Sequence, residues 1–207
     1  VVARAVAMQF ADAVEDATEP YQFALSTRAG LDALAMALRT ATDEDEDAVI
    51  LSLEGVGAYD HIRRAAMLGK LYRTPALRAL LPFVRRFYGR ASEYVWTDDA
   101  GNQSTVRQGE GGERGDPLMP ALYALGQHDG LCAGADQLHA DDFVVAYLDD
   151  LYVKTTKERA YAAFTAVSQA VEHHAGVATS YGKLRAWCRG GGPAPPDLLT
   201  LPDREEI

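Results

Sequence analysis

Three carboxylates stand beside apolar runs whose length and composition are typical of buried β-strands. Glu54 directly follows the run 48–53, and Asp149 and Asp150 lie in a short connection between two further apolar runs. Such a pattern predicts one strand that ends at Glu54 and one tight hairpin with paired carboxylates at its tip. If these strands are neighbours in one sheet, the three acids meet at one of its edges.

Carboxylates that are held close together repel one another and therefore need cations. Mg²⁺ takes oxygen ligands from one or two carboxylates and leaves the rest of its shell to water and phosphate. Two such ions, ~3.5–4 Å apart, stabilise the attacking and leaving oxygens of a phosphoryl transfer. If Glu54, Asp149 and Asp150 do meet, Mg²⁺ is their natural partner. The alternative is that Asp149 and Asp150 are only the polar turn of a hairpin.

Cysteine and histidine provide no comparable pattern. The two cysteines, Cys132 and Cys188, are far apart, and the spacing of His128 and His139 around Cys132 matches no common zinc site. No disulfide framework is expected, which favours a reducing, intracellular setting. No apolar run approaches the ~18 residues that cross a bilayer, and no signal peptide is evident at the start of the chain.

The elements around the acids alternate irregularly between helices and strands, with local hairpins. This order favours an α+β fold, with helices on one face of the sheet. The acidic run 43–47 is expected to be a solvated loop without a function. Further expected elements are helices over 2–14, 27–39, 117–131 and 157–174, a β-hairpin over 93–107, and a turn and strand over 176–187.

The motifs and their order resemble those of reverse transcriptases of the non-LTR retrotransposon type. The segment LSLEGVGAYDHI at 51–62 resembles their first catalytic motif, and GEGGERGDPLMP at 109–120 resembles the second. The third corresponds to AYLDD at 146–150, and the lysine motif that follows corresponds to Gly182-Lys183. The segment EPYQFALSTRAG at 19–30 resembles the region before the first motif.

This resemblance covers roughly residues 1–187 and implies a right-hand polymerase palm, an antiparallel sheet backed by helices. We expect a palm with partial fingers over 1–189, no thumb, and a Gly/Pro-rich tail over 190–207 that is a linker or a frayed end. Because the finger segments with their phosphate-binding Lys and Arg would precede residue 1, the chain is expected to be a piece of a longer polyprotein.

The resemblance also implies roles for single residues. The three acids would hold the two Mg²⁺ ions, and Tyr59 would lie under the sugar and exclude a 2′-hydroxyl; otherwise it is a core aromatic. Gly115 would let the backbone approach the base pair at the insertion site, or it is an ordinary turn glycine. Lys183 would neutralise or protonate the pyrophosphate leaving group, or it is a surface lysine.

Two residues depart from the family's pattern. Glu54 stands where the family has Asp, and the extra methylene moves the carboxylate by over ~1 Å, a displacement that can reduce a rate ~100-fold. Arg114 stands where the family has Gln, and its fixed positive charge would either pair with a phosphate or block the nucleotide site.

The charge of the chain is divided unevenly. Lys and Arg number 20 against 30 Asp and Glu, and this excess of acids taken alone argues against a nucleic-acid partner. Residues 61–90, however, contain eight basic residues and no acidic one, with aromatic residues between them. We expect this segment to lie along a nucleic-acid backbone, or to be a solvated helix face. The residues predicted to contact nucleic acid are Arg63, Arg64, Arg85 and Arg86.

The leading hypothesis is an RNA-directed DNA polymerase domain that transfers dNTPs to a primer 3′-OH by Mg²⁺-dependent nucleotidyl transfer. Its partners would be an RNA template and a DNA primer, without a membrane, and the family implies a nuclear setting. Because Glu54, Arg114 and the absent fingers depart from the family, the alternative is an inactive palm remnant that at most binds RNA. A palm-fold nucleotide cyclase is the third possibility, and the helix that follows Gly115 has no role in it.

Overall fold

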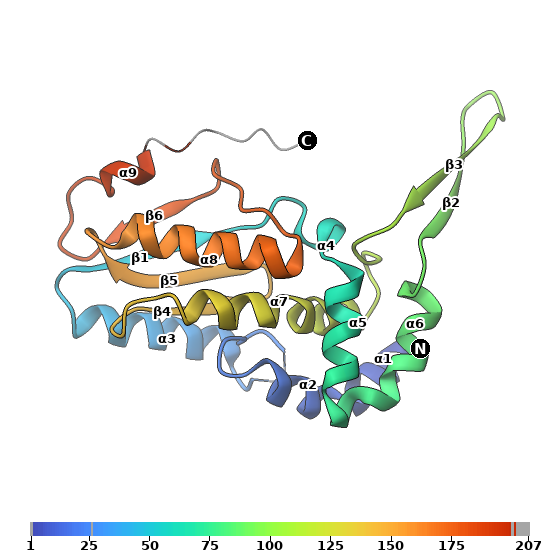
Figure 1. Ribbon diagram of the computed structural model, residues 1–207, viewed down its shortest axis with the longest axis horizontal. Helices are drawn as coiled ribbons and strands as arrows, with labels where there is room; N and C mark the ends of the chain where they lie inside the picture. The colour runs from blue at the N-terminus through green and yellow to red at the C-terminus, as the bar shows by residue number, and fades with distance from the viewer. Residues whose placement is uncertain (1, 26, 200, 202–207) are drawn as a thin grey trace.

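The computed structural model of the protein describes residues 2–25, 27–199 and 201, and it is built around a single antiparallel sheet (Figure 1). Four strands form this sheet in the order β4-β5-β1-β6. The strands are β1 at Ala48–Leu53, β4 at Phe143–Tyr147, β5 at Asp150–Thr156 and β6 at Arg185–Cys188. The order makes β1, which precedes Glu54, a direct neighbour of β5, which begins at Asp150.

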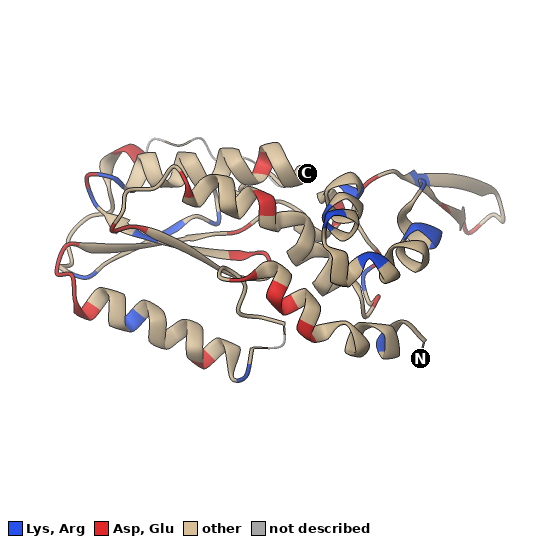
Figure 2. Ribbon diagram, turned by 60° about the horizontal axis from the view of Figure 1, so that its bottom comes forward, with Lys and Arg blue, Asp and Glu red and all other residues tan. Residues whose placement is uncertain are grey.

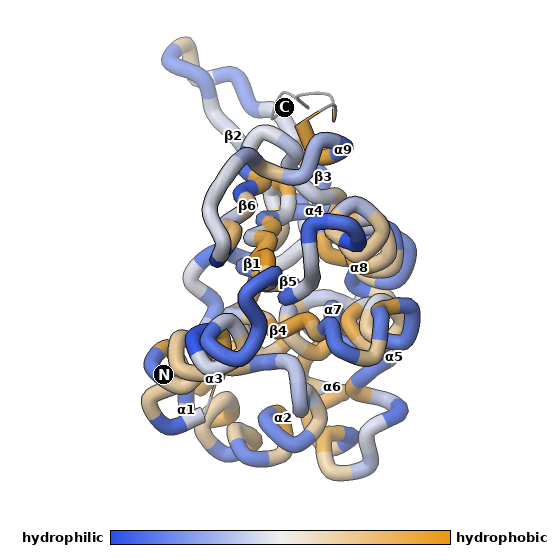
Figure 3. The backbone as a smooth tube through the Cα atoms, turned by 90° about the vertical axis from the view of Figure 1, so that its left-hand side faces the viewer, coloured by the Kyte–Doolittle hydropathy of each residue, from blue (hydrophilic) through white to orange (hydrophobic). Residues whose placement is uncertain are grey.

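Helices lie on both sides of the sheet, so the expectation of helices on one face is wrong (Figure 2, Figure 3). The helices α7, at Met119–Ala135, and α8, at Ala160–Ala175, lie on one side, and α3, at Gly30–Asp43, lies on the other (Figure 2, Figure 3). The remaining helices are α1 at Val2–Gln9, α2 at Ala11–Thr18, α4 at Ala58–His61, α5 at Arg64–Arg73, the 3₁₀ helix η1 at Pro75–Leu80, α6 at Leu81–Tyr88 and α9 at Pro196–Leu199.

The core lies between the sheet and the pair α7 and α8. Alternation along β1 and β5 points Leu51, Leu53 and Val153 into this layer, where each is at most 1% exposed. Two glycines of α7 let α8 approach closely, because a Cβ at Gly130 would lie 2.9 Å from the Cα of Val171. At Gly134 it would lie 3.1 Å from the Cα of Val167. The close packing fixes α7, and with it the loop that precedes it.

The strands β2, at Ser92–Thr97, and β3, at Gln103–Gln108, form a separate antiparallel hairpin. Figure 1 shows that this hairpin stands away from the rest of the molecule, beyond α6. The hairpin predicted over 93–107 is confirmed. So are the α+β class, the antiparallel sheet and the tight connection between β4 and β5.

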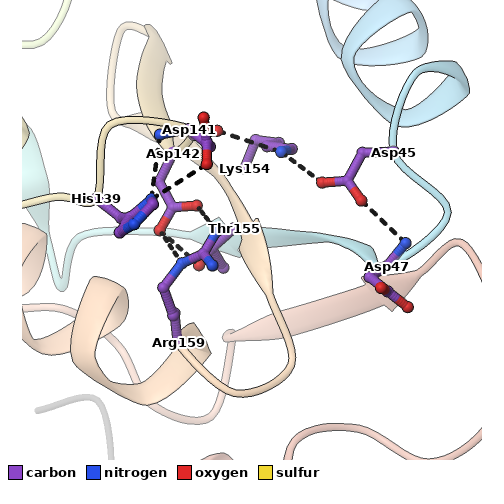
Figure 4. A network of polar contacts seen from close by, with 8 residues as sticks. All are labelled: Asp45, Asp47, His139, Asp141, Asp142, Lys154, Thr155 and Arg159. Carbon is purple, nitrogen blue, oxygen red and sulfur yellow. Dashed lines mark hydrogen bonds and ion pairs between the residues drawn. The ribbon is translucent and has the colours of Figure 1, made fainter.

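The acidic run differs from the sequence-based expectation of a solvated loop. Asp45 accepts a hydrogen bond from Lys154, with Nζ and Oδ2 2.7 Å apart, and the Lys154 side chain is only 7% exposed. The pKa of the Asp45 carboxyl is lowered, chiefly by this hydrogen bond. Figure 4 shows the network around this pair at the end of the sheet where β1 begins. The expectation of a solvated loop is therefore wrong for Asp45.

The predicted Gly/Pro-rich tail is partly folded. Helix α9 lies against α8, and its Leu198 is 8% exposed within the hydrophobic core. This part of the tail is packed onto the domain rather than being a linker or a frayed end, while residues 200 and 202–207 lie outside the described part of the chain. None of the described helices combines the length and the apolar composition that a membrane-spanning helix needs.

Candidate active site

A cavity of about 690 Å³ lies where β1 ends, beside the connection between β4 and β5. Its walls come from the segment after β1, the loop before α7, the β4–β5 connection and the turn before β6. The predicted site residues that line it are Glu54, Tyr59, Arg114, Gly115, Asp149 and Lys183. The cavity thus gathers side chains from four separate parts of the sequence.

Backbone pairing beyond the end of β1 places Glu54 beside Lys183. The amide of Ser180 donates to the carbonyl of Glu54 at 2.8 Å, and the amide of Val56 donates to the carbonyl of Ala178 at 2.8 Å. The turn that follows Ser180 brings the Lys183 Nζ 3.0 Å from the Glu54 Oε1. Both side chains remain more than a third exposed, at 43% and 37%, so a ligand in the cavity reaches them.

The register of the sheet brings the other two acids to the same edge. Leu53 pairs with Leu151 across β1 and β5, so the next residues at this end of the two strands are Glu54 and Asp150. The pKa of the Asp150 carboxyl is raised by partial burial, then by the charges of Asp149 and Glu54, while Lys183 opposes the shift. The predicted convergence of the three acids is confirmed, and their charges act on one another.

The oxygen atoms of these side chains are the kind of ligand that Mg²⁺ takes. Among the described residues, no group of three or more His, Cys, Asp or Glu side chains is arranged to hold a metal ion. Mg²⁺ does not require such a group, since one or two carboxylates with water and substrate phosphates complete its shell. Glu54 and Asp149 line the cavity and fit that role, whereas Asp150 lies outside the described residues that line it.

Tyr59 packs on the core and also lines the cavity. It is half-buried, and its ring stacks on the buried Tyr123 with the centroids 4.8 Å apart and the planes 15° apart. Burial, with a smaller effect of the Asp149 charge, raises the pKa of Tyr59 to about 12. The neutral ring is therefore fixed by a core contact while its other side lines the cavity.

The loop before α7 is attached to the segment that carries Tyr59. The amide of Gly112 donates to the Tyr59 carbonyl at 2.9 Å, and the amide of Gly111 donates to the Ile62 carbonyl at 2.8 Å. Gly115 has a φ of +92°, and a Cβ there would meet no atom within 4 Å. Glycine is thus required for the backbone conformation, and the space beside it is open to the cavity.

Arg114 forms an ion pair on the rim of the cavity. Its Nη2 lies 2.6 Å from the Asp60 Oδ2, and the side chains are 78% and 40% exposed. Asp60 was not among the predicted site residues, although it follows Tyr59 directly and lies in the same motif. An acid beside a predicted site residue was the available signal, but the sequence alone did not show that Arg114 would face it.

The basic segment 61–90 is not a uniform surface. Arg64 is 4% exposed, and its guanidinium donates to the carbonyls of Gly111 and Arg90 at 2.8 and 2.7 Å and to the Ser92 hydroxyl at 3.0 Å. It also lies over the ring of Tyr88, 5.4 Å from its centroid. This placement does not fit the predicted contact with nucleic acid. Arg64 instead joins the loop before α7 to the base of the β2–β3 hairpin.

The other three predicted arginines are exposed. Arg63 donates to the carbonyl of His173, and Arg85 and Arg86 lie on α6. Figure 2 shows Lys and Arg on the helices at the end of the molecule from which the β2–β3 hairpin projects. These arginines lie outside the cavity lining, and contact with a nucleic acid stays a prediction for them.

No protein-family model and no curated protein matches the chain. Solved structures of telomerase do resemble it. The structure from Candida albicans in complex with a TWJ fragment of telomeric RNA has a TM-score of 0.65 at 11% identity, over 90% of this chain and 35% of that one. The corresponding complex from Candida tropicalis has a TM-score of 0.63 at 9% identity, over 89% and 33%.

The chain has a reverse-transcriptase-like fold. Apo telomerase from Candida tropicalis, truncated from the C-terminal domain, agrees, with a TM-score of 0.62 at 10% identity over 93% of this chain and 41% of that one. At such identities the likeness concerns the fold alone. The chain spans between a third and two fifths of the length of these telomerase chains. The expected palm-like fold is confirmed at this level, and the retrotransposon type stays a prediction.

Proposed function

We propose that the chain is the palm of an RNA-directed DNA polymerase that transfers deoxynucleotides to a primer 3′-OH on an RNA template. The observation that carries the proposal is the cavity. It gathers six predicted site residues where β1 ends, in a reverse-transcriptase-like sheet. The charged side chains at this edge remain exposed to the cavity, so a ligand can reach them.

Glu54 and Asp149 would hold Mg²⁺, with Asp150 adding negative charge beside them. The ions, when bound, would supply the charge neutralisation on which phosphoryl transfer between nucleotides depends. Lys183 is placed to hold a proton close to the leaving pyrophosphate once its Nζ exchanges the Glu54 oxygen for a phosphate oxygen. Tyr59 presents a rigid, neutral ring to the sugar, because the stack on Tyr123 fixes it.

Arg114 has a binding role in this scheme. A guanidinium recognises a carboxylate and a phosphate with the same geometry, so the phosphates of an incoming nucleotide compete with Asp60 for it. Gly115, beside it, leaves room for the base pair at the insertion site.

The remaining parts of the proposal rest on the family resemblance and on the neighbours. Two of the telomerase structures that resemble this chain contain a fragment of telomeric RNA, which supports an RNA partner. A DNA primer, dNTPs, an origin in a non-LTR retrotransposon polyprotein and a nuclear setting belong to the same proposal.

Primer extension on poly(rA)/oligo(dT) tests the polymerase directly. The chain would be fused to family fingers and thumb and supplied with dTTP and Mg²⁺. Extension is expected, with a faster rate in Glu54→Asp and a higher KM for dTTP in Arg114→Gln, and Asp149→Asn serves as the inactive control. No extension even in the double variant Glu54→Asp, Arg114→Gln would contradict a competent palm.

A specific observation favours one second candidate, an inactive palm that binds RNA. Both residues that depart from the family's pattern are occupied by partners within the chain, Glu54 by Lys183 and Arg114 by Asp60. RNA binding that weakens steeply with salt, in the absence of extension by any variant, would support this candidate. No binding at low salt would remove the RNA partner as well.

A further inference from the structure

The turn that carries Asp149 has an unfavourable backbone conformation. Leu148, which precedes Asp149, has a φ of +56°, in the left-handed region that residues other than glycine rarely adopt. Such a conformation persists only where the surrounding structure enforces it. The contacts of Leu148 therefore decide whether the Asp149 carboxylate stays at the cavity.

A segment from the beginning of the chain lies along the strand that leads into this turn. The amide of Ala146 donates to the carbonyl of Tyr21 at 2.8 Å, and the amide of Phe23 donates to the carbonyl of Ala146 at 2.9 Å. Gln22 and Ala146 form a parallel bridge between these bonds. The side chain of Gln22 is thereby brought within reach of the turn two residues further along.

The Gln22 side chain contacts the strained residue itself. Its Oε1 accepts the amide hydrogen of Leu148 at 2.8 Å, across 126 residues of sequence, and also that of Ala24 at 3.3 Å. The side chain is 7% exposed, so water does not compete strongly for this oxygen.

The other end of the same amide indicates why the residue is glutamine. The Nε2 of Gln22 is buried and has no hydrogen-bond partner among the described residues. A buried donor without a partner lowers the stability of the fold, so the NH₂ group of Gln22 does not explain why a glutamine stands here. Its oxygen is the part that is used, and that oxygen holds Leu148.

We propose that Gln22 is a positioning residue, which fixes the Leu148–Asp149 turn and thereby directs the Asp149 carboxylate into the cavity. The inference rests on the proposed function in that Asp149 is the acting group. It predicts that loss of the Gln22 oxygen frees the turn without loosening the sheet.

Hydrogen exchange of the Leu148 amide, measured by NMR on the full chain without metal, tests this. Gln22→Met keeps the length of the side chain and removes the acceptor, so exchange at Leu148 should be about tenfold faster. Gln22→Glu keeps the acceptor and should restore slow exchange. The amide of Leu51, in the central strand, is the reference and should not change in either variant.

Unchanged exchange at Leu148 in Gln22→Met would overturn the proposal. So would equal acceleration at Leu148 and Leu51, since that would mean a general loss of stability. If Gln22→Met does not fold, Gln22→Asn decides, because its shorter amide withdraws the oxygen while the site stays polar; it should also accelerate exchange at Leu148.

A Mn²⁺ titration followed by EPR separates this inference from the proposed function. Where the wild-type chain binds Mn²⁺, Gln22→Met should bind it severalfold more weakly and Gln22→Glu should not show this loss. Absence of Mn²⁺ binding and of primer extension by the wild-type chain would remove the polymerase proposal. The Leu148 exchange result would still decide whether Gln22 holds the turn.

Discussion

The two ends of the central sheet both hold carboxylates and cations, but in different surroundings. Where β1 begins, the side chains of Asp142 and Lys154 are 1% and 7% exposed, and their partners are Arg159 and Asp45 (Figure 4). Where β1 ends, both ion pairs, Glu54 with Lys183 and Arg114 with Asp60, remain open to the cavity.

This difference separates charges that maintain the fold from charges that a ligand replaces. A buried ion pair that loses one partner leaves the other without compensation, so such pairs are difficult to exchange. An exposed pair contributes little to stability, and its partners exchange readily for other ions. Chemistry is therefore expected at the open end, and its predictions follow from that contrast.

The largest effect is expected for Asp142→Ala at the closed end. Asp142 accepts hydrogen bonds from Arg159 at 2.6 and 3.0 Å and from Thr155 at 3.0 Å, and removing it leaves these donors unpaired. The free energy of unfolding, measured with urea, should fall by about 3 kcal/mol. The neighbouring Asp141, whose side chain is 76% exposed, is the matched control, and Asp141→Ala should change it by less than about 0.5 kcal/mol. Equal losses would remove the contrast between buried and exposed acids.

Asp149→Asn should have the opposite profile. The rate of primer extension should decrease at least ~100-fold, because the neutral amide of asparagine is a poor ligand for Mg²⁺. The free energy of unfolding should not decrease, since the change removes one of the like charges that raise the pKa of Asp150. A fall in the free energy of unfolding comparable to that of Asp142→Ala would show that the charges at both ends of the sheet maintain the fold.

The dependence of stability on pH should also differ between the ends. The pKa of Asp45 is lowered in the folded chain, so its contribution is present above the usual carboxyl pKa and is lost as the pH falls through the lowered value. The pKa of Asp150 is raised, so its ionisation opposes folding once the pH exceeds the usual value. Urea unfolding between pH 3 and 7 should therefore show a smaller acid loss for Asp45→Asn than for the wild type, and a larger one for Asp150→Asn. Parallel curves for all three proteins would contradict this assignment.

The smallest effect on stability is expected for Arg114→Gln. Its side chain is the most exposed among the four ion-paired cations Arg114, Lys154, Arg159 and Lys183, so the free energy of unfolding should change by no more than about 0.5 kcal/mol. Removing Asp60 instead, by Asp60→Asn, should have an equally small effect. A loss above about 1 kcal/mol in either variant would mean that this pair belongs to the fold and is not exchangeable.

Two of the cavity's acids follow from strand patterns in the sequence, whereas its other predicted residues follow from the family resemblance. Glu54 and Asp149 converge as predicted, because an apolar run bounded by an acid specifies both the strand and the end at which the acid lies. Asp60 and Gln22 were not predicted as site residues, since their partners Arg114 and Leu148 come from distant segments and the sequence does not show these pairings. Arg64 resembled a surface residue by composition. Only the structure shows that Arg64 is buried and donates a hydrogen bond to the carbonyl of Gly111 in the loop before α7.

The backbone pairing beyond β1 has a mechanical consequence. The amide of Ser180 donates to the carbonyl of Glu54, and the amide of Val56 donates to the carbonyl of Ala178. The backbone segments that carry the Glu54 carboxylate and Lys183 are therefore hydrogen-bonded to each other. Their separation is therefore set by main-chain geometry, and only the tips of the two side chains are adjustable. A substrate that enters the cavity therefore finds the charges of Glu54 and Lys183 already side by side, and binding requires only that this ion pair separates.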